Sequence, residues 1–169
     1  MELLLANRER ILELVKVLEN MDDNIYSISI PILFQSSVGE HVRHIYEFYE
    51  CLFNSANENV ICYDTRNRSL ELQTSRELCL KKLVEITDRL HILDLNKELI
   101  LKTKLVYDSD NFYFSETSIQ RELLFILDHT IHHMAIIRIG IESLNLDIKI
   151  PEFFGFTPST VKHKLKVSS

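Results

Sequence analysis

Apolar residues recur every three or four positions along most of the chain, the spacing that places them on one face of a helix. Four segments have this pattern, and three of them begin at residues suited to capping a helix. The predicted helices run from about Glu2 to Met21, from Ser36 or Ser37 to about Ser55, from Thr74 through Leu93, and from Thr117 to about Leu144. Four amphipathic helices in a chain of this length predict an all-α four-helix bundle.

Two of the helix starts match a capping box, in which a hydroxyl side chain and a residue three positions later satisfy each other's backbone amides. Thr74 and Glu77 have this spacing, and so do Thr117 and Gln120. We therefore place the N-caps of the third and fourth helices at Thr74 and Thr117.

The segment from Leu99 to Ser115 departs from the helical pattern. It combines β-forming residues with a turn cluster at residues 108–111, and an aromatic run follows. This arrangement predicts a short β-hairpin between the third and fourth helices. Residues 57–73 are predicted to be a polar loop. The tail from about 146 to 169 contains two prolines and a glycine, and we expect it to be mostly irregular.

Composition agrees with a single domain covering residues 1–169. Apolar residues make up 46% of the chain, while glycine and proline occur three times each, which favours long helices over a turn-rich β fold. The formal net charge is −6 and no long block of Lys and Arg occurs, so no nucleic-acid partner is expected. No run approaches the roughly 20 apolar residues of a membrane helix, so no membrane partner is expected either.

The cysteines suggest the compartment. Cys51, Cys62 and Cys79 are odd in number and form no C-x-x-C pair, which is typical of reduced thiols. The N-terminus lacks the basic segment and apolar run of a signal peptide. Both observations predict a cytoplasmic protein.

Histidines are the residues that suggest chemistry. His129 and His133 are four apart on the predicted fourth helix, so their imidazoles leave one face about a turn apart and can converge on one cation. Their neighbours are largely apolar, and burying imidazoles there costs free energy unless their nitrogens are satisfied. His132 lies about 60° from His129 around the helix, and we assign it to the flank of the site or to a role behind a ligand.

The predicted second helix supplies the other half of the site. His41 and His44 are three apart and share a broad face with Glu47. Either histidine can complete a three-histidine site against the fourth helix, and spacing favours neither. Glu47, one turn after His44, is placed to hydrogen-bond behind a ligand, although an exposed glutamate fits the pattern equally well.

Three neutral imidazoles leave the remaining coordination positions to water or substrate, which is the pattern of a catalytic metal site. Zinc, nickel and iron(II) all suit imidazole ligands, and the sequence does not select among them. We therefore predict a divalent-metal centre with an open position.

The loop sequence YDTRNR contains Asp64, Arg66 and Arg68. Guanidinium groups bind carboxylates or phosphates in a bidentate manner, so the loop is a candidate anion site. The alternative, which we favour, is a brace in which Asp64 pairs with one arginine and holds the loop to the bundle.

Two motifs resemble those of the DinB/YfiT-like superfamily of metal-binding four-helix bundles, SVGEHVRHIYEFYECLF in the second helix and LLFILDHTIHHMAI in the fourth. The segments YDTRNR, RELLF and FGFTPST also resemble those of a bacterial subgroup, so the resemblance covers nearly the whole chain. It implies His44 as the second-helix ligand, beside His129 and His133. Many relatives have Arg-Gly-Gln after the last of these histidines, whereas MAI follows His133 here.

The resemblance also implies an activity. Members of known activity are mostly metal-dependent thiol transferases, so the implied function is a thiol (S-)transferase or a hydrolase that activates a thiol or water on the metal. The implied partner is a small-molecule substrate such as a low-molecular-weight thiol, and a homodimer is compatible with this interpretation. The alternative is a non-catalytic, metal-stabilised bundle that acts as a binding or structural protein, since one fold hosts many functions.

Overall fold

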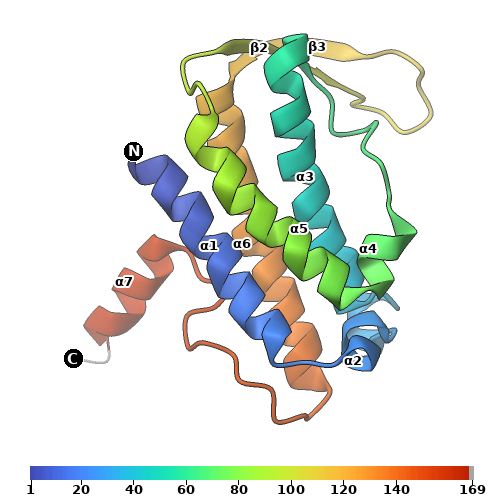
Figure 1. Cartoon of the computed structure of the whole chain (residues 1–169), viewed down its shortest axis with the longest axis vertical. Coiled ribbons are helices and arrows are strands. Elements are labelled where there is room, and N and C mark those ends of the chain that lie inside the picture. The colour runs from blue at the N-terminus through green and yellow to red at the C-terminus, as the bar shows by residue number, and fades with distance from the viewer. Residues whose placement is uncertain (168–169) are drawn as a thin grey trace.

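The computed structural model describes residues 1–167, and its main body is a bundle of four long helices (Figure 1). They are α1 (Glu2–Glu19), α3 (Val38–Glu58), α5 (Arg76–Arg89) and α6 (Ile119–Ser143). Each helix packs against two others, in the order α1, α6, α3, α5 and back to α1. The predicted four-helix bundle is therefore confirmed, with helix boundaries close to the predicted ones.

Helix α3 begins at a capping box one turn before His41. The Ser37 hydroxyl accepts a hydrogen bond from the Glu40 backbone amide at 3.1 Å, and the Glu40 carboxylate accepts one from the Ser37 amide at 2.9 Å. This reciprocal pair satisfies two of the amides that a helix leaves free at its N-terminus. Ser37 rather than Ser36 is therefore the N-cap, two turns ahead of His44.

The predicted N-caps of α5 and α6 are each wrong by one residue. Ser75 caps α5 and accepts from a helix amide at 3.3 Å, because Thr74 is the last residue of the short helix α4 (Leu70–Thr74). Ser118 caps α6, and the Thr117 hydroxyl instead donates to a buried carboxylate of that helix at 2.6 Å. In both places the adjacent serine takes the role, since serine is at least as good an N-cap as threonine.

Within residues 1–167, the strands form one three-stranded sheet at the end of the bundle that lies at the top of Figure 1. β2 (Glu98–Thr103) and β3 (Tyr113–Ser118) are antiparallel, which confirms the predicted hairpin, although β3 extends beyond Ser115. β1 (Val60–Ile61) pairs in parallel with β2. It lies in the segment predicted to be a polar loop, and two residues are too few to show the alternation of a strand.

Short helices fill the connections between the main elements. α2 (Asp23–Ser27) and η1 (Pro31–Leu33) lie between α1 and α3, and η2 (Leu90–Ile92) extends α5. The predicted irregular tail is corrected in part, because α7 (Pro158–Val167) is helical. A proline at its first position favours a helix start, but α7 is short, its few apolar residues are separated by Lys and His, and none of its residues is buried.

The segment between α6 and α7 packs back onto α6. The side chain of Phe154 is fully buried, and Gly155 has a φ of 78°, in the left-handed region that glycine adopts readily. A Cβ at this position would lie 2.5 Å from the backbone nitrogen of Ala135 on α6. The glycine of FGFTPST therefore allows the chain to approach α6 directly after His133.

α6 is the one helix within residues 1–167 that is long and apolar enough to cross a membrane by length and composition. The expectation that no segment has this character is corrected for this helix. The charged and histidine residues of α6 interrupt its apolar runs, but they lower the mean hydropathy of the helix only a little. α6 packs against α1, α3 and η1, and a core helix of a bundle passes the same test as a membrane span.

Candidate metal centre

Two helices bring three histidines together. His129 and His133 lie one turn apart on α6, and His44 faces them from α3. One ring nitrogen from each histidine lies within 4.8 Å of the other two. The Nε2 atoms of His44 and His129 are 2.8 Å apart, and the ring centroid of His133 lies 4.6 Å from the centroids of both other rings. The packing of α3 against α6 thus holds a compact group of three imidazoles.

The imidazoles are neutral at neutral pH because the protein shields them from water. Burial, together with the positive charge of Arg66, lowers the pKa of His44 to about 3. Burial likewise lowers the pKa of His129 to about 4 and that of His133 to about 2. A neutral imidazole has a free nitrogen lone pair, which is the form that coordinates a metal.

Aromatic rings form one wall of the cluster. Phe48, one turn after His44 on α3, stacks on the ring of His129 with centroids 4.3 Å apart and 21° between the planes. Its centroid also lies 4.6 Å from that of His44, and the ring of Phe125 lies 5.6 Å from that of His129. These rings exclude water from one side of the imidazoles and restrict their orientations.

The donor set fits a single divalent ion. Ligand nitrogens bonded at about 2.0–2.1 Å to one tetrahedral ion lie about 3.4 Å apart. The upper limit of 4.8 Å for the cluster and the 2.8 Å separation of its closest pair bracket this value. Neutral imidazoles suit zinc, nickel and iron(II), and three protein ligands leave at least one position open.

The two neighbouring histidines lie outside the cluster. His41 contacts it from behind, with its Nδ1 atom 3.0 Å from Nδ1 of His133. The Nε2 atom of His41 is buried and has no hydrogen-bond partner within residues 1–167. His132 is exposed, and its ring meets the edge of His133 at a centroid distance of 5.4 Å. His41 therefore lies behind a cluster histidine, and His132 lies on the flank.

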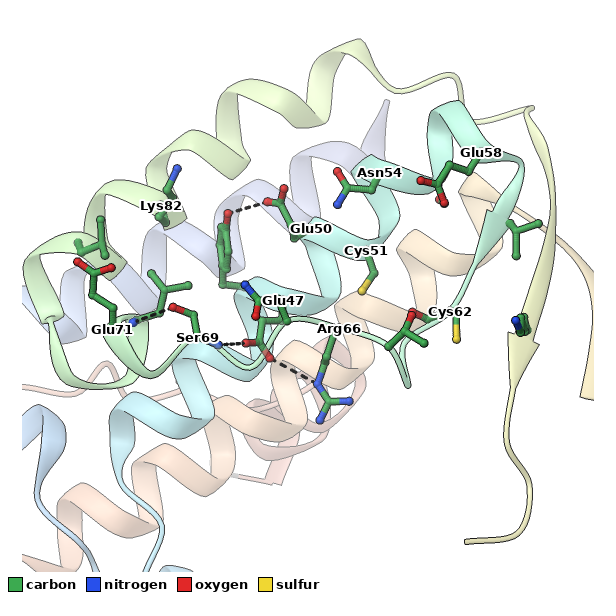
Figure 2. A pocket seen from close by; sticks show the side chains of 18 residues that line it. Glu47, Glu50, Cys51, Asn54, Glu58, Cys62, Arg66, Ser69, Glu71 and Lys82 are labelled. Atoms are coloured by element: carbon green, nitrogen blue, oxygen red, sulfur yellow. Dashed lines mark hydrogen bonds and ion pairs between the residues drawn. The ribbon is translucent and has the colours of Figure 1, made fainter. Parts of the chain in front are cut away.

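Glu47 is buried, but it does not contact the histidines. Its carboxylate accepts a hydrogen bond from the Ser69 backbone amide at 3.0 Å and lies 3.5 Å from Arg66 (Figure 2). It also lies 3.6 Å from Arg43. Burial raises the pKa of Glu47, while the Ser69 amide and the nearby arginines oppose the increase. The interpretation as an exposed glutamate is therefore wrong, and Glu47 joins α3 to the segment that precedes α4.

The YDTRNR loop is braced, although not by the predicted pair. Arg66 makes the contact, through its ion pair with Glu47 and a 3.0 Å hydrogen bond from its guanidinium to the Tyr63 carbonyl. Asp64 instead accepts from the Lys104 backbone amide at 2.8 Å. Arg68 is exposed. Asp64 and the two arginines therefore do not converge, because residues 63–65 form a turn and Asp64 and Arg66 bond to different parts of the protein.

A cavity of about 760 Å³ lies between α3 and the segment that follows β1. Figure 2 shows the side chains that line it. Its wall includes Glu47, Cys51, Cys62 and Arg66. Within the described residues, no histidine lines this cavity. Arg66 lies next to both features, because its guanidinium carbon is 5.7 Å from the centroid of Phe48, the ring that packs on the histidines.

A hydrogen-bonded group of Tyr63, Glu122 and Thr117 lies beside the aromatic wall. The Tyr63 hydroxyl donates to the Glu122 carboxylate at 2.7 Å, and the Thr117 hydroxyl donates to its other oxygen. The Tyr63 ring stacks on Phe48 with centroids 4.6 Å apart. Glu122 lies two turns before His129 on α6, so helical spacing places it on the same face of the helix. The sequence gives no signal for its contact with Tyr63, which is distant in the chain.

Two known proteins resemble the chain over most of its length. FK506-binding protein 5 of Rhizopus delemar is 27% identical over 135 residues, which cover 78% of this chain and 34% of that protein. The chain thus spans about a third of that relative's length. The crystal structure of a DinB-like protein, YjoA of Bacillus subtilis, matches with a TM-score of 0.66 at 18% identity and covers 91% of this chain and 99% of YjoA. At this identity the match shows a shared fold.

A family model extends this result to the site. The model of the DinB superfamily matches residues 4–137, a range that contains α3, most of α6 and all three histidines of the cluster. The four-helix bundle, the position of the cluster between α3 and α6, and this match agree with one another. The chain belongs to the DinB superfamily.

Proposed function

We propose that this chain is an enzyme that binds one divalent metal ion through His44, His129 and His133 and acts on a small molecule. The observation that supports the proposal is the convergence of three neutral imidazole nitrogens, within 4.8 Å of one another, at a half-buried site. Three protein ligands with an open position are typical of catalytic metal sites. The proposed reaction is thiol (S-)transfer, with a low-molecular-weight thiol as one substrate, or hydrolysis.

The residues around the cluster support this chemistry. A bound metal supplies Lewis acidity and lowers the pKa of a thiol or water at its open position. Phe48 and Phe125 keep solvent away from one side of the imidazoles. The charge of Arg66, which contributes to the lowered pKa values of His44 and His129, favours an anionic group near the histidines.

The cavity beside α3 is the proposed place for the part of the substrate that does not react. Its volume of about 760 Å³ lies in the range of small-molecule pockets. Arg66 lines this cavity and also lies over Phe48, so an anionic group held by Arg66 would lie between the cavity and the cluster. The three cysteines are free thiols. The cytoplasmic location and the homodimer stay predictions.

Metal binding is tested by elemental analysis of protein purified without an affinity tag. We expect about one equivalent of a divalent metal after reconstitution, and its loss when His129 and His133 are both replaced by alanine. The exposed pair His91 and His163, replaced in the same way, is the matched control. Substoichiometric metal that does not change in the His129 and His133 variant would contradict the proposal.

The alternative function is structural, and the position of the cluster supports it, since the three histidines join α3 to α6. Cobalt-substituted protein separates the two functions. An open position should give a spectral shift when azide or a thiol is added. A purely structural site should give no shift, and removal of its metal should lower the melting temperature sharply. A silent cobalt spectrum would therefore exclude the enzyme and leave the structural alternative.

A further inference from the structure

His41 makes a direct contact with one member of the cluster. It lies one turn before His44 on α3, and its Nδ1 atom is 3.0 Å from Nδ1 of His133. The two ring centroids are 5.2 Å apart and the planes are inclined by 42°. This distance is that of a hydrogen bond, so one of the two nitrogens carries a proton and the other accepts it.

The contact restricts which nitrogen His133 can offer to a cation. A histidine that coordinates a metal uses one ring nitrogen and donates its other N–H to a nearby acceptor. The Nδ1 atom of His133 faces His41, so Nε2 is the nitrogen left for a cation. With Nε2 unprotonated, the proton of neutral His133 lies on Nδ1, and Nδ1 of His41 must be the acceptor.

We propose that His41 is a positioning residue that fixes the tautomer and the ring orientation of His133 for metal binding. This inference rests on the proposed metal centre. In this arrangement the single ring proton of His41 lies on Nε2, the buried nitrogen that has no partner within residues 1–167. Nδ1 of His41 then has its lone pair free to accept the hydrogen bond from His133.

His132 provides a matched comparison. It is adjacent to His133 in sequence, but its ring is exposed and meets His133 edge-on, with an interplanar angle of 84°. No hydrogen bond joins the two rings within the described chain. If His41 affected metal binding only because an imidazole lies near His133, His132 would have the same effect. If His41 acts as a hydrogen-bond acceptor, only His41 should affect metal binding.

The test compares two substitutions of similar shape at His41. Asn places an oxygen acceptor near the position of Nδ1, whereas Leu fills similar space without an acceptor. We expect His41→Leu to weaken zinc binding about 10- to 100-fold, as loss of the hydrogen-bond partner of a ligand typically does, and His41→Asn to restore most of the affinity. His132→Leu is expected to bind zinc as the wild type does. The measurement is a competition titration against a chromophoric chelator, with far-UV circular dichroism to confirm folding.

A second measurement uses only the wild type. Two-bond proton–nitrogen correlation spectra of the zinc-loaded, ¹⁵N-labelled protein report the tautomer of each histidine, and we expect the His133 proton on Nδ1. A proton on Nε2 of His133, or a His41→Leu variant that binds zinc as tightly as the wild type, would overturn the role of His41 while leaving the metal centre intact. A wild type that binds no zinc and no other divalent metal would overturn both.

Discussion

Two histidines three residues apart on α3 have different surroundings. His44 meets His129 through Nε2 at 2.8 Å, whereas His41 meets His133 through Nδ1 at 3.0 Å. Residues three apart on a helix point about 60° apart, and this angle is enough to place one ring inside the cluster and the other behind it. Spacing alone could not separate them, because either face can turn toward α6.

His44 and His41 should contribute differently to the affinity for zinc. Replacing His44 by alanine removes a ligand, whereas replacing His41 removes only a contact behind a ligand. A four-ligand zinc site contributes about 10–16 kcal/mol, a few kcal/mol per ligand. We therefore expect His44→Ala to weaken zinc binding about a hundred- to a thousandfold, and more than His41→Ala does. A chelator competition titration measures both, and retention of zinc by His44→Ala together with its loss in His41→Ala would contradict this assignment.

A second residue-scale expectation concerns Gly155. Its φ of 78° and the 2.5 Å approach of a built Cβ to Ala135 both disfavour a side chain, so Gly155→Ala is expected to destabilise the fold by about 1–3 kcal/mol. Urea denaturation monitored by circular dichroism measures the change. Ser159→Ala, at an exposed position of α7, is the control and should have little effect. Equal stability of the two variants would show that the chain does not need this close approach.

The starts of the two helices that carry the histidines are fixed by local hydrogen bonds. α3 is fixed at its start by the reciprocal hydrogen bonds of Ser37 and Glu40, and α6 by Ser118. The two cluster histidines of α6 lie three and four turns into a helix whose start is capped, so their direction is set by the helix rather than by a loop. A site on long, capped helices is held more precisely than one on loops.

The cap of α3 can be tested directly. Ser37→Ala should destabilise the protein by about 1 kcal/mol, the usual effect of removing an N-cap hydroxyl. Ser36→Ala is the matched control, because Ser36 was the other candidate cap and its side chain does not take this role. Thermal unfolding of both variants provides the measurement. A larger effect at Ser36 than at Ser37 would contradict the cap described above.

The long helices could be predicted from sequence because each carries a repeating apolar pattern, and the hairpin because β-forming residues flank a turn cluster. β1 and α4 could not, since two strand residues and a five-residue helix are too short to show such a pattern. α7 could not, because its few apolar residues lie among Lys and His in a tail rich in turn-forming residues. At the site, spacing paired His129 with His133, and the resemblance supplied His44. The contact between Glu47 and Arg66 depends on how the segment before α4 packs on α3, and no local pattern contains that information.

At the scale of the whole molecule, the cluster affects how stability depends on pH. The folded protein lowers the pKa of His44, His129 and His133 to about 3, 4 and 2, whereas an unfolded histidine has a pKa near 6.5. Between these values the unfolded chain binds more protons than the folded one. The stability of the metal-free protein is therefore greatest above pH 6.5 and is lost as the pH falls below it.

The melting temperature of chelator-treated protein should fall steadily from pH 6.5 to pH 5, a range above the titration of most carboxylates. Replacing His129 and His133 by Asn should make this dependence weaker, because two of the three groups that take up protons on unfolding are gone. A wild-type profile that is flat between pH 5 and 6.5 would contradict the buried, neutral state of the imidazoles.

The placement of the histidines also makes any bound ion a removable cross-link. His44 and His129 are 85 residues apart in sequence, so an ion held by both closes a very long loop. Closing such a loop in the unfolded chain costs considerable entropy, and the H-x-x-x-H pair alone offers only two ligands. Strong coordination is therefore expected only after α3 and α6 have packed against each other during folding. The bound ion would then lower the rate of unfolding more than it raises the rate of folding.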